Sequence, residues 1–155
     1  MKARLMRLKD TLVKRGLALA VAESMTGGAF SDLITSVPGA SGFFLGGVIS
    51  YSPKLKVMMG VPETVLKRQK AYSEEVSIRL AKGARKRFGA DIAVGITGIA
   101  HPDRGHRAPG AWIAIASDDK VRTKHVQCRA GVRRNDARKH VAMAAVELLL
   151  DVLRP

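Results

Sequence analysis

A short apolar run, a polar glycine-rich stretch and an amphipathic helix follow one another near the start of the chain, and they restrict its fold most. Residues Leu17 to Ala22 read L-A-L-A-V-A, which is typical of a buried strand. From Ala29 to Val37, apolar side chains recur at helical spacing. The stretch between them, A-E-S-M-T-G-G, contains an acid, two hydroxyls and two glycines. A hydroxyl at such a turn is either a helix cap or a nucleophile, because the first turn of a helix offers unpaired N–H groups.

Alternating strands and helices continue through the rest of the chain. We expect one domain over residues 1–155, folded as a three-layer α/β/α sandwich around a mixed, mostly parallel five-stranded sheet with one antiparallel hairpin. Gly46 and Gly47 indicate a bend or bulge in the second strand. The further strands are predicted at Phe43–Tyr51, Asp91–Thr97, Ala111–Ala116 and Val121–Cys128, and the helices at Lys2–Arg15, at 26–37, after Pro53 and Pro62, at Ser73–Phe88 and at Arg133–Leu153.

The balance of charges is strongly basic. Lys and Arg total 27 against 13 Asp and Glu, which gives a net charge of +14 and a pI near 10.6. This favours a phosphorylated substrate or a polyanionic partner. Nucleic acid is a partner we do not favour, because the basic residues are spread over several helices and only 5% of residues are aromatic.

Membranes, disulfides and metals also find little support in the sequence. No apolar run approaches the roughly 20 residues that span a bilayer. Cys128 is the only cysteine, which excludes an intrachain disulfide and fits a reducing, cytoplasmic compartment. His101 and His106 lie in one loop with Asp103, but this spacing is a weak metal signal. We therefore expect no metal and no other cofactor.

Three polar loops leave the ends of predicted strands, and they supply the candidate catalytic residues. The loops read E-S-M-T-G-G, S-Y-S-P-K-L-K and T-G-I-A-H-P-D. Ligands bind beyond the carboxyl ends of the strands in open α/β sheets, so neighbouring strand ends would place Ser24, Thr26, Tyr51, Lys56 and Thr97 in one pocket. Ser24 is the first candidate for a nucleophile and Thr26 the second, while a desolvated Lys56 can act as the base.

The same loops suggest supporting roles, each with an ordinary structural alternative. Tyr51 is a candidate proton relay or orienting group, and the amides of Gly27 and Gly28 are candidate oxyanion donors. Alternatively, the hydroxyls cap a helix, Tyr51 packs its ring at a strand end, Lys56 is solvated, and Thr97 is simply a favourable strand residue.

The chain resembles the C-terminal domain family of CinA, the competence- and damage-inducible proteins. The likeness lies in A-V-A-E-S-M-T-G-G-A-F, V-P-G-A-S-G-F-F-L-G-G-V-I-S-Y-S, K-V-M-M-G-V and A-V-G-I-T-G-I-A-H-P-D. It implies a mixed five-stranded sheet in an α/β/α sandwich, in the stand-alone form of the family. It also implies an amidase that needs no metal and hydrolyses nicotinamide mononucleotide to nicotinic acid mononucleotide and ammonia, in pyridine nucleotide salvage.

The resemblance extends to single site residues. Ser24, Thr26, Tyr51 and Lys56 match the family's catalytic loops, and Lys54, Arg104 or Arg133 would meet the substrate phosphate. Arg138 matches a second arginine at the start of the last helix. The substrate-binding residues that the resemblance implies are Glu23, Gly27, Gly28, Ser52, Thr97, Gly98, Asp103 and Arg133.

Departures from the family pattern keep other hypotheses open. Met25 stands where the family has a cysteine, and His101 and Arg104 replace glycines in the loop over residues 98–109. One alternative is a protein that kept the fold, lost catalysis and binds nucleic acid or another polyanion. Another is an amidase for a related metabolite. The sequence leaves the oligomeric state open, with Met58, Met59 and the F-F-L segment as candidates for a subunit interface.

Overall fold

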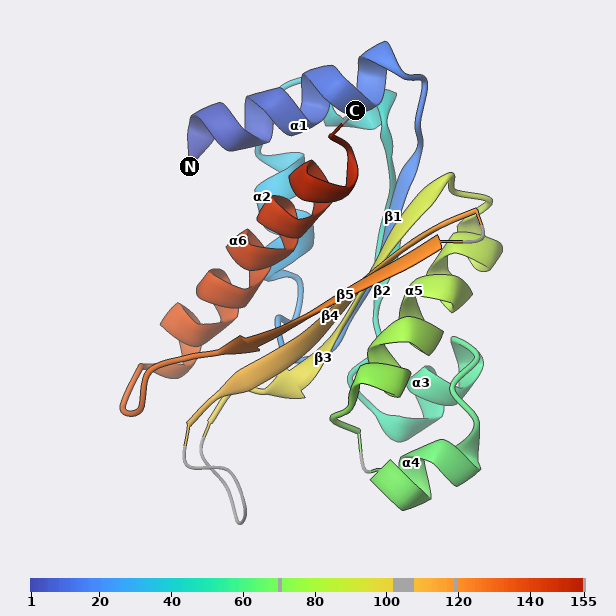
Figure 1. Ribbon diagram of the computed structural model, residues 1–155, viewed down its shortest axis with the longest axis vertical. Coiled ribbons are helices and arrows are strands. Elements are labelled where there is room, and N and C mark those ends of the chain that lie inside the picture. The colour runs from blue at the N-terminus through green and yellow to red at the C-terminus, as the bar shows by residue number, and fades with distance from the viewer. Residues whose placement is uncertain (70, 102–107, 119, 155) are drawn as a thin grey trace.

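A computed structural model describes residues 1–69, 71–101, 108–118 and 120–154. These residues form a central five-stranded sheet with helices on both faces (Figure 1). In chain order the elements are α1 (Lys2–Lys14), β1 (Leu19–Glu23), α2 (Ala29–Thr35), the 3₁₀ helix η1 (Ala40–Gly42), β2 (Phe44–Ile49), α3 (Pro53–Met58), α4 (Glu63–Gln69), α5 (Glu74–Phe88), β3 (Ile92–Ile99), β4 (Gly110–Ser117), β5 (Lys120–Gln127) and α6 (Arg134–Val152).

The strand order in the sheet is β2-β1-β3-β4-β5. β1 pairs in parallel with both β2 and β3, whereas β4 runs antiparallel to both β3 and β5. The sheet is therefore mixed, with β4 as its one reversed strand, and the predicted fold class and hairpin are confirmed. The carboxyl ends of β1, β2 and β3 meet at one edge, where ligands bind in sheets of this kind.

Helices α1, α2 and α6 cover one face of the sheet, and α3, α4 and α5 cover the other (Figure 1). The first layer packs Leu8, Leu12 and Phe30 onto alternate residues of β1 and β3, and the second packs Val76 and Leu80 onto the residues between them. This arrangement follows from the two-residue period of a strand, which sends successive side chains to opposite faces. Within the part of the chain that the structure describes, no helix is long and apolar enough to cross a membrane.

Three local features differ from the sequence prediction or refine it. Helix α2 begins at Ala29 rather than near Thr26, because Gly27 and Gly28 adopt left-handed backbone angles with φ of 56° and 99°. Such angles cannot belong to a right-handed helix, and they suit glycine. The predicted irregularity in β2 is confirmed, since the register with β1 shifts between Phe44 and Gly46. The short helix η1 had no counterpart in the prediction.

Gly95 lets α5 approach β3 closely. A Cβ atom added at this position would lie 2.1 Å from the carbonyl oxygen of Ser77 and 2.5 Å from the backbone nitrogen of Ala81. Both contacts are with helix backbone, which cannot move aside without shifting α5. The close approach fixes α5 against the strand that leads to Thr97 and Gly98.

We predict that Gly95→Ala lowers the free energy of unfolding by about 1–3 kcal/mol, because an extra methyl group cannot be accommodated against helix backbone. Gly42→Ala is the matched control, since an added Cβ there meets no atom within 4 Å, and its effect should stay within about 0.5 kcal/mol. Urea unfolding of the purified variants measures both values. Equal stability of the two variants would show that the helix adjusts to the added methyl group.

Candidate active site

Ser24 and Lys56 meet at the carboxyl edge of the sheet. The Nζ atom of Lys56 lies 3.0 Å from the Ser24 hydroxyl oxygen, 2.6 Å from the carbonyl oxygen of Ser50 and 3.1 Å from that of Tyr51. Ser24 follows β1 directly, and Lys56 is carried by α3, whose first turn is capped by the Ser52 hydroxyl. The structure thus brings together a hydroxyl and an amine that are remote in sequence, as the strand-end argument predicted.

Burial makes Lys56 unusual among the lysines. Its side chain is 1% exposed, and no ion pair joins it to any residue that the structure describes. Desolvation disfavours the charged form, which lowers its pKa from 10.5 to about 8. A neutral amine carries two N–H donors and one lone pair. It can therefore donate to the carbonyls of Ser50 and Tyr51 and accept the hydroxyl proton of Ser24.

Glu23 holds the loop that carries Ser24. Its fully buried carboxylate accepts hydrogen bonds from the backbone amides of Gly28 (3.0 Å), Phe30 (3.2 Å) and Ser31 (2.9 Å), and from the Ser31 hydroxyl (2.6 Å). These amides belong to the start of α2, so Glu23 supplies the cap that no hydroxyl provides. Ser24 is not a helix cap, and the Glu23 carboxylate serves the fold instead of facing a ligand.

The glycine amides expected to bind an oxyanion are already engaged. Gly27 N–H donates to the Ser24 carbonyl at 3.1 Å, and Gly28 N–H donates to Glu23. In this geometry neither amide is free to bind an oxyanion, because the tight turn uses both donors itself. By contrast, the backbone amides of Met25 and Thr26 form no hydrogen bond within the described part of the chain. They belong to the two residues that follow Ser24 and are the loop amides without a partner in that part of the chain.

Thr26 lies in the same loop but has no base beside it. Its hydroxyl oxygen is buried and has no hydrogen-bond partner among the described residues. The loop carbonyls are fixed from α6, because Arg138 donates to the carbonyl oxygens of Thr26 at 2.8 Å and Gly27 at 3.1 Å. The geometry therefore favours Ser24 over Thr26 as the activated hydroxyl.

Tyr51 contributes to the lysine site through its backbone. Its carbonyl accepts from Lys56, whereas its ring is 59% exposed and its hydroxyl accepts from Arg134 at 2.9 Å. A proton relay through the Tyr51 hydroxyl is not what this geometry shows. Arg133 is exposed and paired with Asp136 at 2.7 Å, whereas Arg134 is the arginine that contacts Tyr51. The spacing of Arg134 and Arg138 places both on one helix face, a signal that could have identified Arg134 from the sequence.

Thr97 and Gly98 lie near the carboxyl end of β3, where both contact neighbouring backbone. Thr97 is fully buried and donates its hydroxyl to the carbonyl of Ala71, and a Cβ on Gly98 would lie 2.2 Å from the Gly110 carbonyl. Asp103 and Arg104 lie outside the described residues. Among the residues described, no group of three or more His, Cys, Asp or Glu side chains is placed to hold a metal ion.

Comparison with known proteins identifies the family. The model of the CinA C-terminal domain matches residues 2–153. This chain belongs to the CinA C-terminal domain family. It is 42% identical over 150 residues to a CinA-like protein of Thermotoga maritima, covering 95% of the chain, and 37% identical over 147 residues to one of Desulfotalea psychrophila, covering 94%. In both cases it spans 35% of the relative's length.

Solved structures of CinA proteins have the same fold. A CinA superfamily protein from Enterobacter cloacae superimposes with a TM-score of 0.91 at 26% identity, covering 97% of this chain and 90% of the other. The competence/damage-inducible protein CihA from Agrobacterium tumefaciens gives a TM-score of 0.88 at 28% identity, with coverages of 98% and 94%. These similarities confirm the resemblance drawn from the loops of the sequence.

We predict that Glu23→Gln lowers the free energy of unfolding by about 2 kcal/mol or more, because an amide NH₂ would face backbone N–H donors in a buried site. Glu147→Gln is the matched control, since Glu147 forms an exposed ion pair with Arg4 and should contribute less than about 1 kcal/mol. Urea unfolding measures both variants. A Glu23→Gln protein as stable as Glu147→Gln would contradict the capping role.

We also predict that burial of Lys56 makes stability rise with pH. Above about pH 8 the folded protein has lost the Lys56 proton, while the unfolded chain keeps it up to its pKa of 10.5. The unfolded state then binds more protons, so the free energy of unfolding increases by about 2 kcal/mol between pH 7 and pH 10 relative to Lys56→Met. Lys54→Met controls for the loss of one lysine on the same helix. A wild-type to Lys56→Met difference that does not change with pH would show that the pKa of Lys56 is not lowered.

Proposed function

We propose that this chain hydrolyses a carboxamide with Ser24 as nucleophile and Lys56 as general base. The observation that carries this proposal is the 3.0 Å contact between the Ser24 hydroxyl and a buried lysine whose pKa is about 8. A hydroxyl needs a nearby base to become a nucleophile, and a desolvated lysine near neutral pKa is suited to this role. No other hydroxyl among the described residues contacts Lys56.

The reaction begins when the Ser24 oxygen attacks the carboxamide carbon and its proton passes to the Lys56 amine. The resulting tetrahedral oxyanion is bound by the backbone amides of Met25 and Thr26, which have no other partner in the described chain. The Lys56 ammonium gives its proton to the NH₂ group of the intermediate, and collapse of the intermediate breaks the C–N bond and releases ammonia. A water molecule, deprotonated by Lys56, then attacks the acyl-serine ester and releases the carboxylate and the Ser24 hydroxyl.

Nicotinamide mononucleotide is the substrate we propose, with nicotinic acid mononucleotide and ammonia as products. The support is the activity that the family resemblance implies, together with Arg134 on Tyr51 and Arg138 on the loop that carries Ser24. Arg134, anchored on Tyr51, lies at the same edge and is placed to meet a phosphate group. The names of the solved relatives refer to competence and damage and name no substrate, so the choice of this substrate rests on the family resemblance and on these cations.

The test is release of ammonia from nicotinamide mononucleotide by the purified chain. Ser24→Ala should lower kcat by about a thousandfold or more, because it removes the nucleophile, and Lys56→Met should do the same by removing the base. Thr26→Val is the matched control that removes the second hydroxyl of the loop and should retain most of the activity. In wild type, the rate should rise about tenfold per pH unit until about pH 8, where Lys56 becomes neutral.

Two further measurements test the proposed mechanism and the proposed substrate separately. Hydroxylamine should trap the acyl group from wild type but not from Ser24→Ala, which identifies the covalent intermediate. Nicotinamide and nicotinamide riboside test whether the phosphate is required. Turnover of a phosphate-free amide alone would retain the mechanism and reject the nucleotide. Activity that survives Ser24→Ala but not Thr26→Val would reject Ser24 as the nucleophile.

A further inference from the structure

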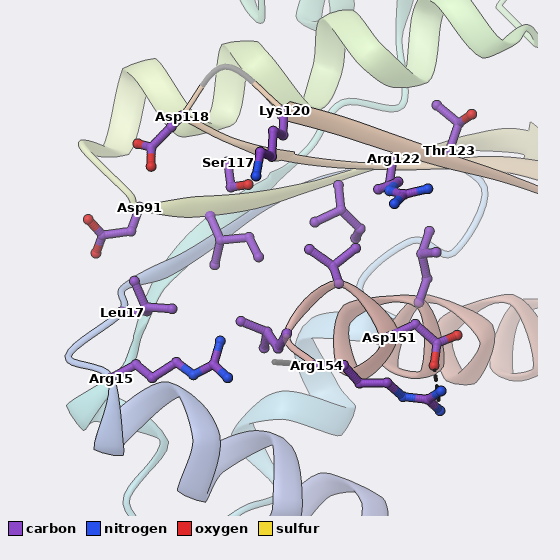
Figure 2. A pocket seen from close by; sticks show the side chains of 15 residues that line it. Arg15, Leu17, Asp91, Ser117, Asp118, Lys120, Arg122, Thr123, Asp151 and Arg154 are labelled. Atoms are coloured by element: carbon purple, nitrogen blue, oxygen red, sulfur yellow. Dashed lines mark ion pairs between the residues drawn. The ribbon is translucent and has the colours of Figure 1, made fainter.

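A cavity lies at the opposite edge of the sheet from Ser24. Its volume is about 850 Å³, and it is bounded by the start of β3, the turn between β4 and β5, and the last turns of α1 and α6 (Figure 2). Neither Ser24 nor Lys56 lines it. The volume falls within the range of roughly 300–1,000 Å³ that is typical of small-molecule sites.

Three cationic side chains line this cavity without an ion-pair partner in the described part of the chain. Arg15, Lys120 and Arg122 make no ion pair among the residues that the structure describes, and Figure 2 shows Arg15 on the opposite side of the cavity from Lys120 and Arg122. Three carboxylates also line the cavity, and each has a partner in the described chain. Asp118 pairs with Arg85 at 2.8 Å, Asp151 with Arg154 at 2.9 Å, and Asp91 accepts from the backbone amide of Ala18 at 2.7 Å.

The inner wall of the cavity is apolar. It consists of aliphatic side chains from the sheet, from α6 and from the residues next to β1 and α6, namely Ile92, Ile115, Leu148, Val152, Leu17 and Leu153. Such a wall would hold the flat or aliphatic body of an organic molecule, since burying apolar surface is favourable. Cations lie on opposite sides of the cavity and its inner wall is apolar. The ligand that fits is therefore an anion with an apolar body.

We propose that this cavity binds an organic polyphosphate of nucleotide size, with its phosphates on Arg122, Lys120 and Arg15 and its ring on the apolar wall. Guanidinium groups bind phosphate through paired charge-assisted hydrogen bonds, and three unpaired cations match a di- or triphosphate in charge. The site is independent of the amide hydrolysis proposed above. It gives part of the chain's net charge of +14 a local function.

Titration calorimetry of the full chain with ATP, tripolyphosphate and adenosine tests this site. ATP should bind more tightly than either fragment, because it alone offers both the charge and the ring. Arg122→Glu should weaken ATP binding by about tenfold or more, since it replaces a phosphate donor by a like charge. Lys82→Glu makes the same change in net charge on an exposed lysine of α5, which covers the other face of the sheet, and should alter binding less than about twofold.

Three results would overturn the proposal. The first is that ATP does not bind at low salt. The second is that Arg122→Glu and Lys82→Glu lower the affinity for ATP equally. The third is that Arg134→Glu lowers the affinity for ATP while Arg122→Glu binds ATP normally. The second would show that ATP is attracted by the net positive charge of the protein and not by this cavity. The third would place the phosphates at the edge that carries Ser24. Thermal unfolding of each variant without ligand verifies that the exposed substitutions leave the fold intact.

Discussion

Among the described residues no carboxylate pairs with the buried amine of Lys56, and the lowered pKa of this amine depends on that. Glu23 is equally buried and only one residue away from Ser24, yet its carboxylate is directed to the amides of α2 on the other face of the sheet. The two-residue period of the strand separates the groups, since Glu23 faces α2 and Ser24 faces α3. An ion pair with Glu23 would hold the pKa of Lys56 high and keep it protonated at neutral pH. With Glu23 committed to the helix start, desolvation alone acts on Lys56, and a proton acceptor becomes available near pH 8.

In the loop after β1, some backbone N–H donors form hydrogen bonds within the fold and others have no partner in the described chain. Left-handed angles at Gly27 and Gly28 turn their amides inward, to the Ser24 carbonyl and the Glu23 carboxylate. The amides of Met25 and Thr26 remain without partners in the described chain. Arg138 binds the carbonyl side of the same loop, so its geometry is set from α2 and α6 together. A loop fixed on both sides can hold an oxyanion without reorganising, which is the condition for electrostatic stabilisation of a transition state.

Much of the fold followed from the sequence because its signals are local. Apolar runs marked the strands, Ser73 and Gly89 bounded α5 correctly, and the pairing of Ser24 with Lys56 followed from the rule for strand ends. The remaining errors concern which atoms are already in use. Whether an amide of Gly28 is free depends on the side chain of Glu23, and whether the hydroxyl of Tyr51 reaches the lysine depends on where its ring lies. Which donors and acceptors already have a partner depends on three-dimensional contacts, and residue types alone do not determine it.

The positive charge of the chain acts separately at the two edges of the sheet. β3 runs between them and has 8 residues, which at about 3.3 Å each corresponds to roughly 26 Å. The Debye length at physiological ionic strength is about 8 Å, so exposed cations at one edge are largely screened from the other. Arg122 and Lys120 therefore cannot hold a substrate phosphate near Ser24, nor can they lower the pKa of Lys56 appreciably. An anion at the edge that carries Ser24 would therefore be attracted by Arg134 and its neighbours, and the cations at the far edge act on their own surroundings.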